Sequence, residues 1–307
     1  MGGKKPSGAA KRKKKKEKEE AIERAREEVE RLKLGPTAIW TGLVLHHRDI
    51  FVSHVLPKLN DTDRFFFSEV DDESWDVLEY AGVDVFEQGW CIAKCSSIST
   101  LEWAWNNMKW GGTDTTGSVV DQPWFCHQVA ATNKLEFLKW AREVKKCEWD
   151  EMTINMAVYK GNLEMLKYCF AHDCPCDEKT ACNQAVANGH LDCLRFLLDK
   201  LKPSRKMERE ATMEAAACGQ LDILKYCIEE RKITDCLVDC VGLASEHGKH
   251  ICLKYLVEEV KAPLNDLRLV CVARFEEQPE SENYLLEKGA PEPTDHEYED
   301  YVRRVST

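Results

Sequence analysis

The chain has 307 residues, of which 43% are hydrophobic and 32% are charged, and its net charge is −11. These values are typical of a globular protein with a charged surface, and no apolar run approaches the roughly 20 residues that cross a bilayer, which excludes a membrane protein. The charged N-terminus excludes a secretory signal peptide, so we expect the 15 cysteines to stay reduced inside a cell.

Residues 1–16 form a low-complexity basic tail, which we predict to be disordered. Residues 1–20 carry nine Lys and Arg against three Glu, so a segment of charge +6 precedes a body of charge −17. Such runs serve as nuclear-import signals or contact nucleic acid or anionic lipid, and they also occur as solvated tails. We favour import, which places the protein in the cytoplasm or nucleus, and the acidic body argues against nucleic-acid binding outside the tail. The candidate import signal comprises Lys11, Arg12, Lys13, Lys14, Lys15 and Lys16.

Residues 17–36 are predicted to form a charged spacer helix. Glu20 and Arg24 stand four residues apart, as do Glu27 and Arg31, and such pairs support an isolated helix. The apolar seam extends over about two heptads, which is too short for a coiled coil. The helix should end at the Gly-Pro pair at 35–36.

Residues 37–87 are richer in apolar and aromatic residues and allow two interpretations. Leucines, two aspartates, the run Phe65–Phe67 and Trp75 resemble the latter part of an F-box, the motif that docks the adaptor of cullin-type ubiquitin ligases. The opening Leu-Pro-x-Glu of that motif is missing. The alternative is a helical N-terminal cap over the first of the repeats that follow. Leu56, Leu59 and Phe65 would face the adaptor in the first case and be buried in the second; the three consecutive phenylalanines favour the cap.

Four segments between residues 157 and 257 repeat one pattern. Their sequences are AVYKGNLEMLKYCF, AVANGHLDCLRFLL, AAACGQLDILKYCI and ASEHGKHICLKYLV. Their glycines, Gly161, Gly189, Gly219 and Gly248, are 28, 30 and 29 residues apart, and the residues four, five, eight and nine places after each glycine are apolar. This spacing marks one face of a helix, so each unit is predicted to be a helix, a glycine-centred turn and a second helix.

Weaker copies flank these four. The segment VAATNKLEFLKWAR begins at Val129 and has Asn133 in the glycine's place, and Asn is the other residue that readily takes a left-handed turn conformation. Further copies begin at Cys95 and at Glu282. The sequence therefore predicts an all-α solenoid of five to seven repeats over residues 88–290, followed by an acidic C-terminal tail at 291–307.

The Ala-x-x-x-Gly-[His/Asn/Gln]-Leu core and the segment LLEKGA (Leu285–Ala290) resemble ankyrin repeats over about 170–200 residues. The resemblance implies an ankyrin-like helix-turn-helix solenoid that acts as a non-catalytic scaffold and binds another protein through its concave face. The family's Thr-Pro-Leu-His helix start is missing and the period is shorter than the usual 33, which speaks against full β-hairpin fingers between repeats.

The same resemblance places the partner contacts on the exposed side of each first helix, just before the alanine and just before the glycine. We expect a monomer that binds a protein of unknown identity and requires no cofactor and no metal. The candidate partner-binding residues are Gln128, Thr132, Met156, Tyr159, Lys160, Gln184, Asn188 and Glu214.

The segment HDCPCDEKTAC at residues 172–182 raises the question of a zinc site. Its part CPCDEKT and the segment CEWDEMT from Cys147 are the same connector, one repeat apart, and Cys176 takes the place of Trp149, which cannot bind a metal. Zinc sites in intracellular proteins usually use Cys-x2-Cys pairs, and Cys174 and Cys176 do not form one. We interpret these cysteines as small buried hydrophobic residues of the repeats.

Catalytic motifs are missing from the sequence. The His-Arg-Asp triplet at 47–49 lacks the other parts of a kinase, and neither a phosphate-binding glycine loop nor His-Glu-x-x-His occurs, so no enzyme is predicted. Six of the nine tryptophans fall within residues 103–149. They either pack inside irregular N-terminal repeats or form an interaction hot spot.

Overall fold

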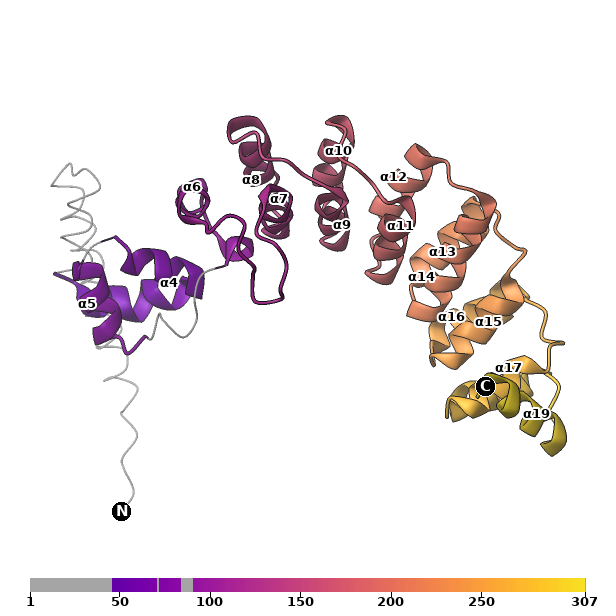
Figure 1. Cartoon of the computed structure of the whole chain (residues 1–307). Helices are drawn as coiled ribbons and strands as arrows, with labels where there is room; N and C mark the ends of the chain where they lie inside the picture. Colours follow the sequence, from indigo (N-terminus) through magenta and orange to yellow (C-terminus); the bar gives the residue numbers. More distant parts are fainter. Residues whose placement is uncertain (1–45, 71, 84–90, 307) are drawn as a thin grey trace, which may run out of the picture. The chain divides into compact units, whose positions relative to one another are not determined.

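The computed structural model describes residues 46–70, 72–83 and 91–306 of the chain. The basic tail with its predicted import signal and the spacer helix at 17–36 lie outside the described residues. The chain divides into two compact units, residues 1–108 and 109–307, and each is described by itself (Figure 1). Every helix in the described ranges is too short or too polar to cross a bilayer.

The first unit is a small helical cluster. Its helices are α3 (Arg48–Ile50), the π-turn η2 (Phe51–Val55), the 3-10 turn η3 (Leu56–Lys58), α4 (Asp61–Ser68), α5 (Asp72–Tyr80), the 3-10 turn η4 (Ile92–Lys94) and α6 (Ile98–Asn107). Asn60 caps α4 by accepting a hydrogen bond from the backbone of Asp63, and Ser97 and Thr100 form a capping box at the start of α6. Phe51, Leu56, Val77 and Leu78 form the core of this cluster.

Helix α4 packs on α6, the helix that corresponds to the weak repeat copy at Cys95. The rings of Phe65 and Phe66 meet the Trp103 ring edge-on, with centroids 5.9 and 5.1 Å apart. The backbone N–H of Cys91 donates to the Thr62 hydroxyl over 3.0 Å. These contacts hold the half-buried aromatic side chains of α4 against a repeat-like helix. The cap at 37–87 remains a prediction.

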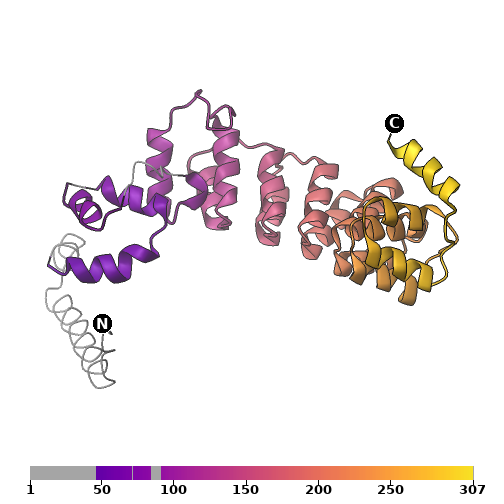
Figure 2. The same cartoon turned by 90° about the horizontal axis from the view of Figure 1, so that it is seen from below.

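The second unit is a stack of helix pairs (Figures 1 and 2). The first helices of the pairs are α7 (Gln122–Ala131), α9 (Glu151–Tyr159), α11 (Glu178–Ala187), α13 (Arg205–Cys218), α15 (Leu237–Glu246) and α17 (Arg268–Phe275). The second helices are α8 (Leu135–Lys139) with η5 (Trp140–Val144), α10 (Leu163–Ala171), α12 (Leu191–Leu201), α14 (Leu221–Lys225) with η6 (Tyr226–Glu230), α16 (His250–Lys254) with η7 (Tyr255–Glu259), and α18 (Pro279–Glu287). A final helix, α19 (Asp295–Val305), follows.

Each first helix contacts the first helix of the next pair, and the second helices follow the same order on the other side of the stack. We call the side formed by the first helices the first-helix face. Within the described residues no strand forms, and the one β-bridge joins Thr113 to Val119 in a hairpin before α7. The predicted all-α repeat solenoid is confirmed.

The turns between the paired helices use a left-handed backbone, as the repeated glycines predict. The φ angles of Gly161, Gly189, Gly219 and Gly248 lie between 60° and 77°, and Asn133 has a φ of 62°. The prediction that Asn133 replaces the glycine is therefore confirmed. Between α17 and α18 the same turn is made by Glu277, with a φ of 54°. Its conformation is set by the repeat and not by its own preference, so the residue type gave no signal.

After three of the turns, a polar residue ties neighbouring repeats together. The Asn162 side chain donates to the backbone oxygen of Asn133 over 3.2 Å, and the His190 ring donates to that of Tyr159 over 3.0 Å. The Gln220 side-chain amide donates to the backbone oxygen of Ala187 over 3.2 Å. The Asn, His or Gln of the sequence core therefore satisfies a carbonyl at the end of the preceding first helix or in the turn that follows it.

The second helices carry a ladder of tyrosine–glutamate hydrogen bonds between repeats. The Tyr168 hydroxyl donates to Glu143 of the preceding repeat over 3.1 Å, and Tyr255 donates to Glu229 over 2.9 Å. Tyr284 repeats the contact with Glu258, 3.1 Å away. Burial, followed by the hydrogen bond to the carboxylate, raises the pKa of each tyrosine, that of Tyr284 to about 12, so the hydroxyls remain donors at neutral pH.

We predict that Tyr255→Phe lowers the free energy of unfolding by about 1 kcal/mol, because the Glu229 carboxylate loses a hydrogen bond. Tyr226→Phe is the matched control. Tyr226 is equivalent to Tyr255, but the preceding repeat offers the shorter Asp199, which pairs with Arg231 over 3.4 Å. The control should therefore change stability by less than about 0.5 kcal/mol. Urea unfolding of both variants measures the difference, and equal losses would contradict the ladder.

The C-terminal segment, which the sequence suggested only as an acidic tail, contains the helix α19. Thr294 and Glu297 form a capping box at its start. The Tyr301 ring lies 6.1 Å from that of Phe275 in α17, and the Arg274 guanidinium lies over the Tyr298 ring. Helix α19 thus packs on the last first helix. The domain boundaries taken from the sequence remain predictions.

Candidate protein-binding face

The cysteines at the ends of the first two repeats make structural contacts. The Cys147 thiol donates to the backbone oxygen of Gln122 over 3.2 Å, and the Cys174 thiol donates to that of Asp150 over 3.3 Å. Each contact fixes the end of a repeat to the start of its own first helix. Within the described ranges, no three His, Cys, Asp or Glu residues lie together in a way that could hold a metal ion.

Most thiols are buried and hard to ionise. Burial raises the pKa of Cys176 to about 11 and that of Cys182 to about 12. Contacts with neighbouring thiols, together with burial, raise the pKa of Cys147 and of Cys174. Because the thiolate is the reactive form of cysteine, these side chains are poor nucleophiles and poor ligands at neutral pH.

We predict that iodoacetamide labels Cys91 first in the folded protein, since Cys91 is exposed. Cys176 and Cys218 are half-buried and have raised pKa values, so their labelling should be slower and should accelerate with pH. The other twelve should react only after urea unfolding. Peptide mapping by mass spectrometry measures each site, and rapid labelling of Cys174 in the folded state would contradict the structural role.

The predicted partner-binding residues all lie on the first helices or on the residue that ends each one. Met156 is half-buried on α9, and Tyr159 has 49% of its surface exposed. Lys160 follows it, with its ammonium 5.4 Å from the centre of the Tyr159 ring. Glu214 is exposed on α13. These four side chains are available to a partner.

The other four predicted residues are partly engaged within the array. The Asn188 amide donates to the backbone and the side-chain oxygen of Gln184, over 2.9 and 3.3 Å. The Thr132 hydroxyl donates to the Val129 carbonyl over 2.7 Å. Gln128 is half-buried and lines a hollow beside the hairpin. Their role as contacts remains a prediction.

The hollow at Gln128 has a volume of about 440 Å³ and lies between α7, the start of α9 and the hairpin at 111–120. Asp114 holds the hairpin, because its carboxylate accepts hydrogen bonds from Thr116, from Ser118 and from the Trp124 indole 2.9 Å away. These bonds, that of the Thr116 side chain foremost, lower the pKa of Asp114. Burial lowers the pKa of His127, so its ring is neutral at pH 7.

The tryptophan cluster divides between the two interpretations. Trp103 packs on phenylalanines of the first unit, and Trp140 is only 8% exposed. Arg142 lies over the Trp149 ring at 4.0 Å. By contrast, Trp124 lines the hollow beside α7, and Trp110 has 41% of its surface exposed. Packing accounts for the first three. The last two are partly exposed and also packed, since the Trp110 ring lies 5.9 Å from that of Phe125 and the Trp124 indole donates to Asp114.

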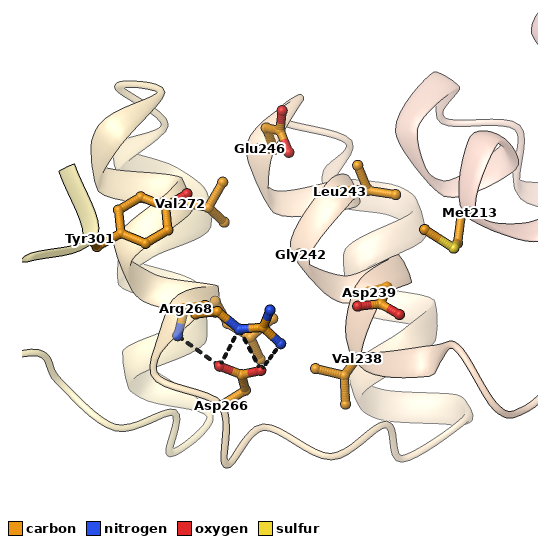
Figure 3. A pocket seen from close by; sticks show the side chains of 11 residues that line it. Met213, Val238, Asp239, Gly242, Leu243, Glu246, Asp266, Arg268, Val272 and Tyr301 are labelled. Atoms are coloured by element: carbon orange, nitrogen blue, oxygen red, sulfur yellow. Dashed lines mark hydrogen bonds and ion pairs between the residues drawn. The ribbon is translucent and has the colours of Figure 1, made fainter. Parts of the chain in front are cut away.

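A second hollow of about 280 Å³ lies on the first-helix face between α13, α15, α17 and α19 (Figure 3). Met213, Leu243 and Val272 line it from three successive first helices, and Tyr301 from α19. The predicted residues do not include any of these. The position just before the alanine of each repeat, which gave the predicted residues, would also have given two residues of this hollow. Leu243 directly precedes Ala244, and Val272 directly precedes Ala273.

Comparison with known proteins agrees with the repeat architecture. Residues 126–207 match the family model of ankyrin repeats in three copies, which cover most of α7 through the start of α13. The chain therefore contains ankyrin repeats, and the pairs from α13 to α18 continue the same geometry. Ankyrin repeats support a protein-interaction scaffold. No curated protein matches the chain. The F-box-like resemblance at 50–75 is not shown.

Proposed function

We propose that the protein is a non-catalytic scaffold whose first-helix face binds another protein. Ankyrin-repeat proteins are generally binding modules without catalysis, and residues 126–207 match that family. The partner should meet the surface that runs from Gln128 on α7 to Val272 on α17. We further propose that the chain acts as a monomer in the cytoplasm or nucleus; the import signal at Lys11–Lys16 stays a prediction.

The observation that carries the proposal is the exposure of large side chains on the first-helix face. Met156 and Tyr159 on α9 and Glu214 on α13 reach solvent there. Several side chains of the second helices are instead used within the array, as in the contacts of Tyr168 with Glu143 and of Tyr255 with Glu229. Large exposed side chains, carried on a rigid array, can be covered by a partner at low entropic cost.

The contacts of the first unit support a cap at 46–83 more than an F-box-like module. Leu56 is 3% exposed within the core of that unit, and Leu59 packs against the same core. Phe65 contacts the Trp103 ring of α6. All three side chains that would dock an adaptor thus make contacts inside the unit. The proposal therefore does not include ubiquitin-ligase recruitment.

The test is capture of partners from a cell lysate by the tagged full chain and two matched variants. Tyr159→Ala/Lys160→Glu changes one large exposed residue and one lysine on the first-helix face. Ile251→Ala/Lys254→Glu makes the same kind of change on α16, where Ile251 is 71% exposed. We expect a set of proteins that the first variant loses and the second retains, with thermal unfolding of both variants close to wild type. Loss in both variants alike, or in neither, would contradict the proposal.

A further inference from the structure

The hollow between α13 and α19 has several apolar side chains in its lining. Leu269 is among them and is 2% exposed, and Met213, Leu243 and Val272 are half-buried (Figure 3). Its volume of about 280 Å³ is at the lower limit of pockets that take drug-sized ligands. A hollow of this size and lining suits one or two large apolar side chains of a partner better than a cofactor.

A single glycine opens this hollow. Gly242 stands six residues before the turn glycine of its repeat, where the two preceding repeats have Met213 and Asn183. Its φ is not in the left-handed region, and an added Cβ would meet Leu269 at an ordinary contact distance of 3.6 Å. Neither the backbone nor the packing therefore requires glycine in the middle of α15, where it costs about 1 kcal/mol relative to alanine. What the glycine provides is space on the first-helix face.

The rim of the hollow is negative. Arg268 contributes a positive charge, but the Asp266 carboxylate pairs with it. The backbone N–H of Arg268 donates to this carboxylate over 2.9 Å, and the Arg268 guanidinium donates to it as well (Figure 3). Asp239 and Glu246 contribute two further carboxylates from α15. Burial, followed by the charge of Glu246, raises the pKa of Tyr301, so its hydroxyl stays protonated on the same rim. A lysine or arginine beside the hollow is favoured, whereas a carboxylate there is repelled.

We propose that this hollow binds a segment of a partner protein in which a large apolar residue such as Leu or Met is flanked by Lys or Arg. The apolar side chain fills the space left by Gly242, and the flanking cations meet Asp239 and Glu246. The inference rests on the proposed function, because it names the chemistry that one part of the first-helix face recognises.

The chain's own N-terminal tail is a poor occupant. Residues 1–20 supply nine basic residues, but among large apolar residues they contain only Met1. A segment of that composition could meet the carboxylates without filling the apolar hollow. A separate partner that carries both features on one segment matches both halves of the site.

Fluorescence anisotropy with a labelled synthetic peptide tests the proposal on the full chain. The probe has two leucines flanked on each side by lysines; one control peptide has serines for the leucines, and another has glutamates for the lysines. We expect the probe to bind and both control peptides to bind at least about tenfold more weakly. Added salt should lower the affinity of the probe.

Two variants of the hollow separate its parts. Gly242→Met fills the space and should lower probe affinity about tenfold or more. Asp239→Asn/Glu246→Gln should lower it about five- to tenfold and flatten the salt dependence. The matched control Glu136→Gln/Glu148→Gln removes two exposed carboxylates from the first repeat and should bind as wild type. Circular dichroism and thermal unfolding check that each variant is folded.

Several outcomes would overturn the proposal. These are no probe binding, equal binding of the serine peptide, or an affinity that Gly242→Met leaves unchanged. If replacing Lys11–Lys16 with glutamine raises probe affinity, the tail competes for the site and the assignment to a separate partner is wrong. Concentration-dependent self-association that Gly242→Met abolishes would assign the hollow to a second copy of the chain. If only this inference fails, capture that depends on Tyr159 and Lys160 persists; if the proposed function fails, that capture is lost as well.

Discussion

Replacing Leu194 with alanine is expected to lower the free energy of unfolding by about 2–5 kcal/mol. Leu194 lies in α12, in the middle of the stack, and its side chain is fully buried. The cost has two parts, the lost burial of the isobutyl group and the cavity that remains. Because each repeat buries its apolar stripe only against its neighbours, a cavity here weakens the coupling between the repeats on both sides.

Urea unfolding followed by far-ultraviolet circular dichroism measures this loss. Ile251→Ala is the matched control, since it removes an aliphatic side chain of the same size that is 71% exposed on α16. The control should change stability by less than about 0.5 kcal/mol. A loss of that small size for Leu194→Ala would show that α12 does not pack as described.

Gly161→Ala is expected to destabilise the protein by about 2–5 kcal/mol. The φ of Gly161 is +66°, and a left-handed conformation costs a residue with a Cβ roughly 1–2 kcal/mol. The added Cβ would also lie 2.5 Å from Nδ1 of His190, so the ring must move and lose its hydrogen bond to the Tyr159 carbonyl. Overpacking of this kind typically adds about 1–3 kcal/mol.

A double-mutant cycle with His190→Ala separates the two contributions. Without the imidazole ring, Gly161→Ala should cost only the backbone part, about 1–2 kcal/mol. Gly242→Ala makes the same substitution inside a helix and should instead stabilise the protein by about 0.5–1 kcal/mol. Equal effects at positions 161 and 242 would contradict the assignment of Gly161 to a left-handed turn.

The repeat architecture could be predicted because its signals recur. A glycine every 28–30 residues gives the turns, and the apolar spacing after it gives the second helices. Asn133 could be recognised because Asn tolerates a positive φ. The same turn at Glu277 could not be recognised from the sequence, because its conformation follows from the helices on both sides and not from the residue type. The structural role of Cys174 followed from its alignment with Cys147, which makes the same thiol contact.

The candidate site was only partly predictable, because it depends on contacts between distant elements. The sequence suggested no more than an acidic tail for the segment that forms α19, and the contact of Tyr301 with Phe275 could not be read from composition. Gln184 and Asn188 satisfy each other, which removes part of their capacity to bind a partner. The hollow itself requires Gly242 to face Leu269 of the next repeat, a relation that only the packed helices define.

Hydroxyl-radical footprinting of the full chain, alone and with a partner captured as above, tests the central claim most directly. The oxidation rates of individual side chains report how much of each is covered. On the first-helix face, Met156, Tyr159 and Phe275 are partly or largely exposed, the latter two by 49% and 37%. On the second helices, Phe170 and Phe196 are half-buried and serve as internal references. We predict that the partner slows oxidation on the first-helix face and leaves Phe170 and Phe196 unchanged; protection of these two with no change at Met156, Tyr159 and Phe275 would contradict the account.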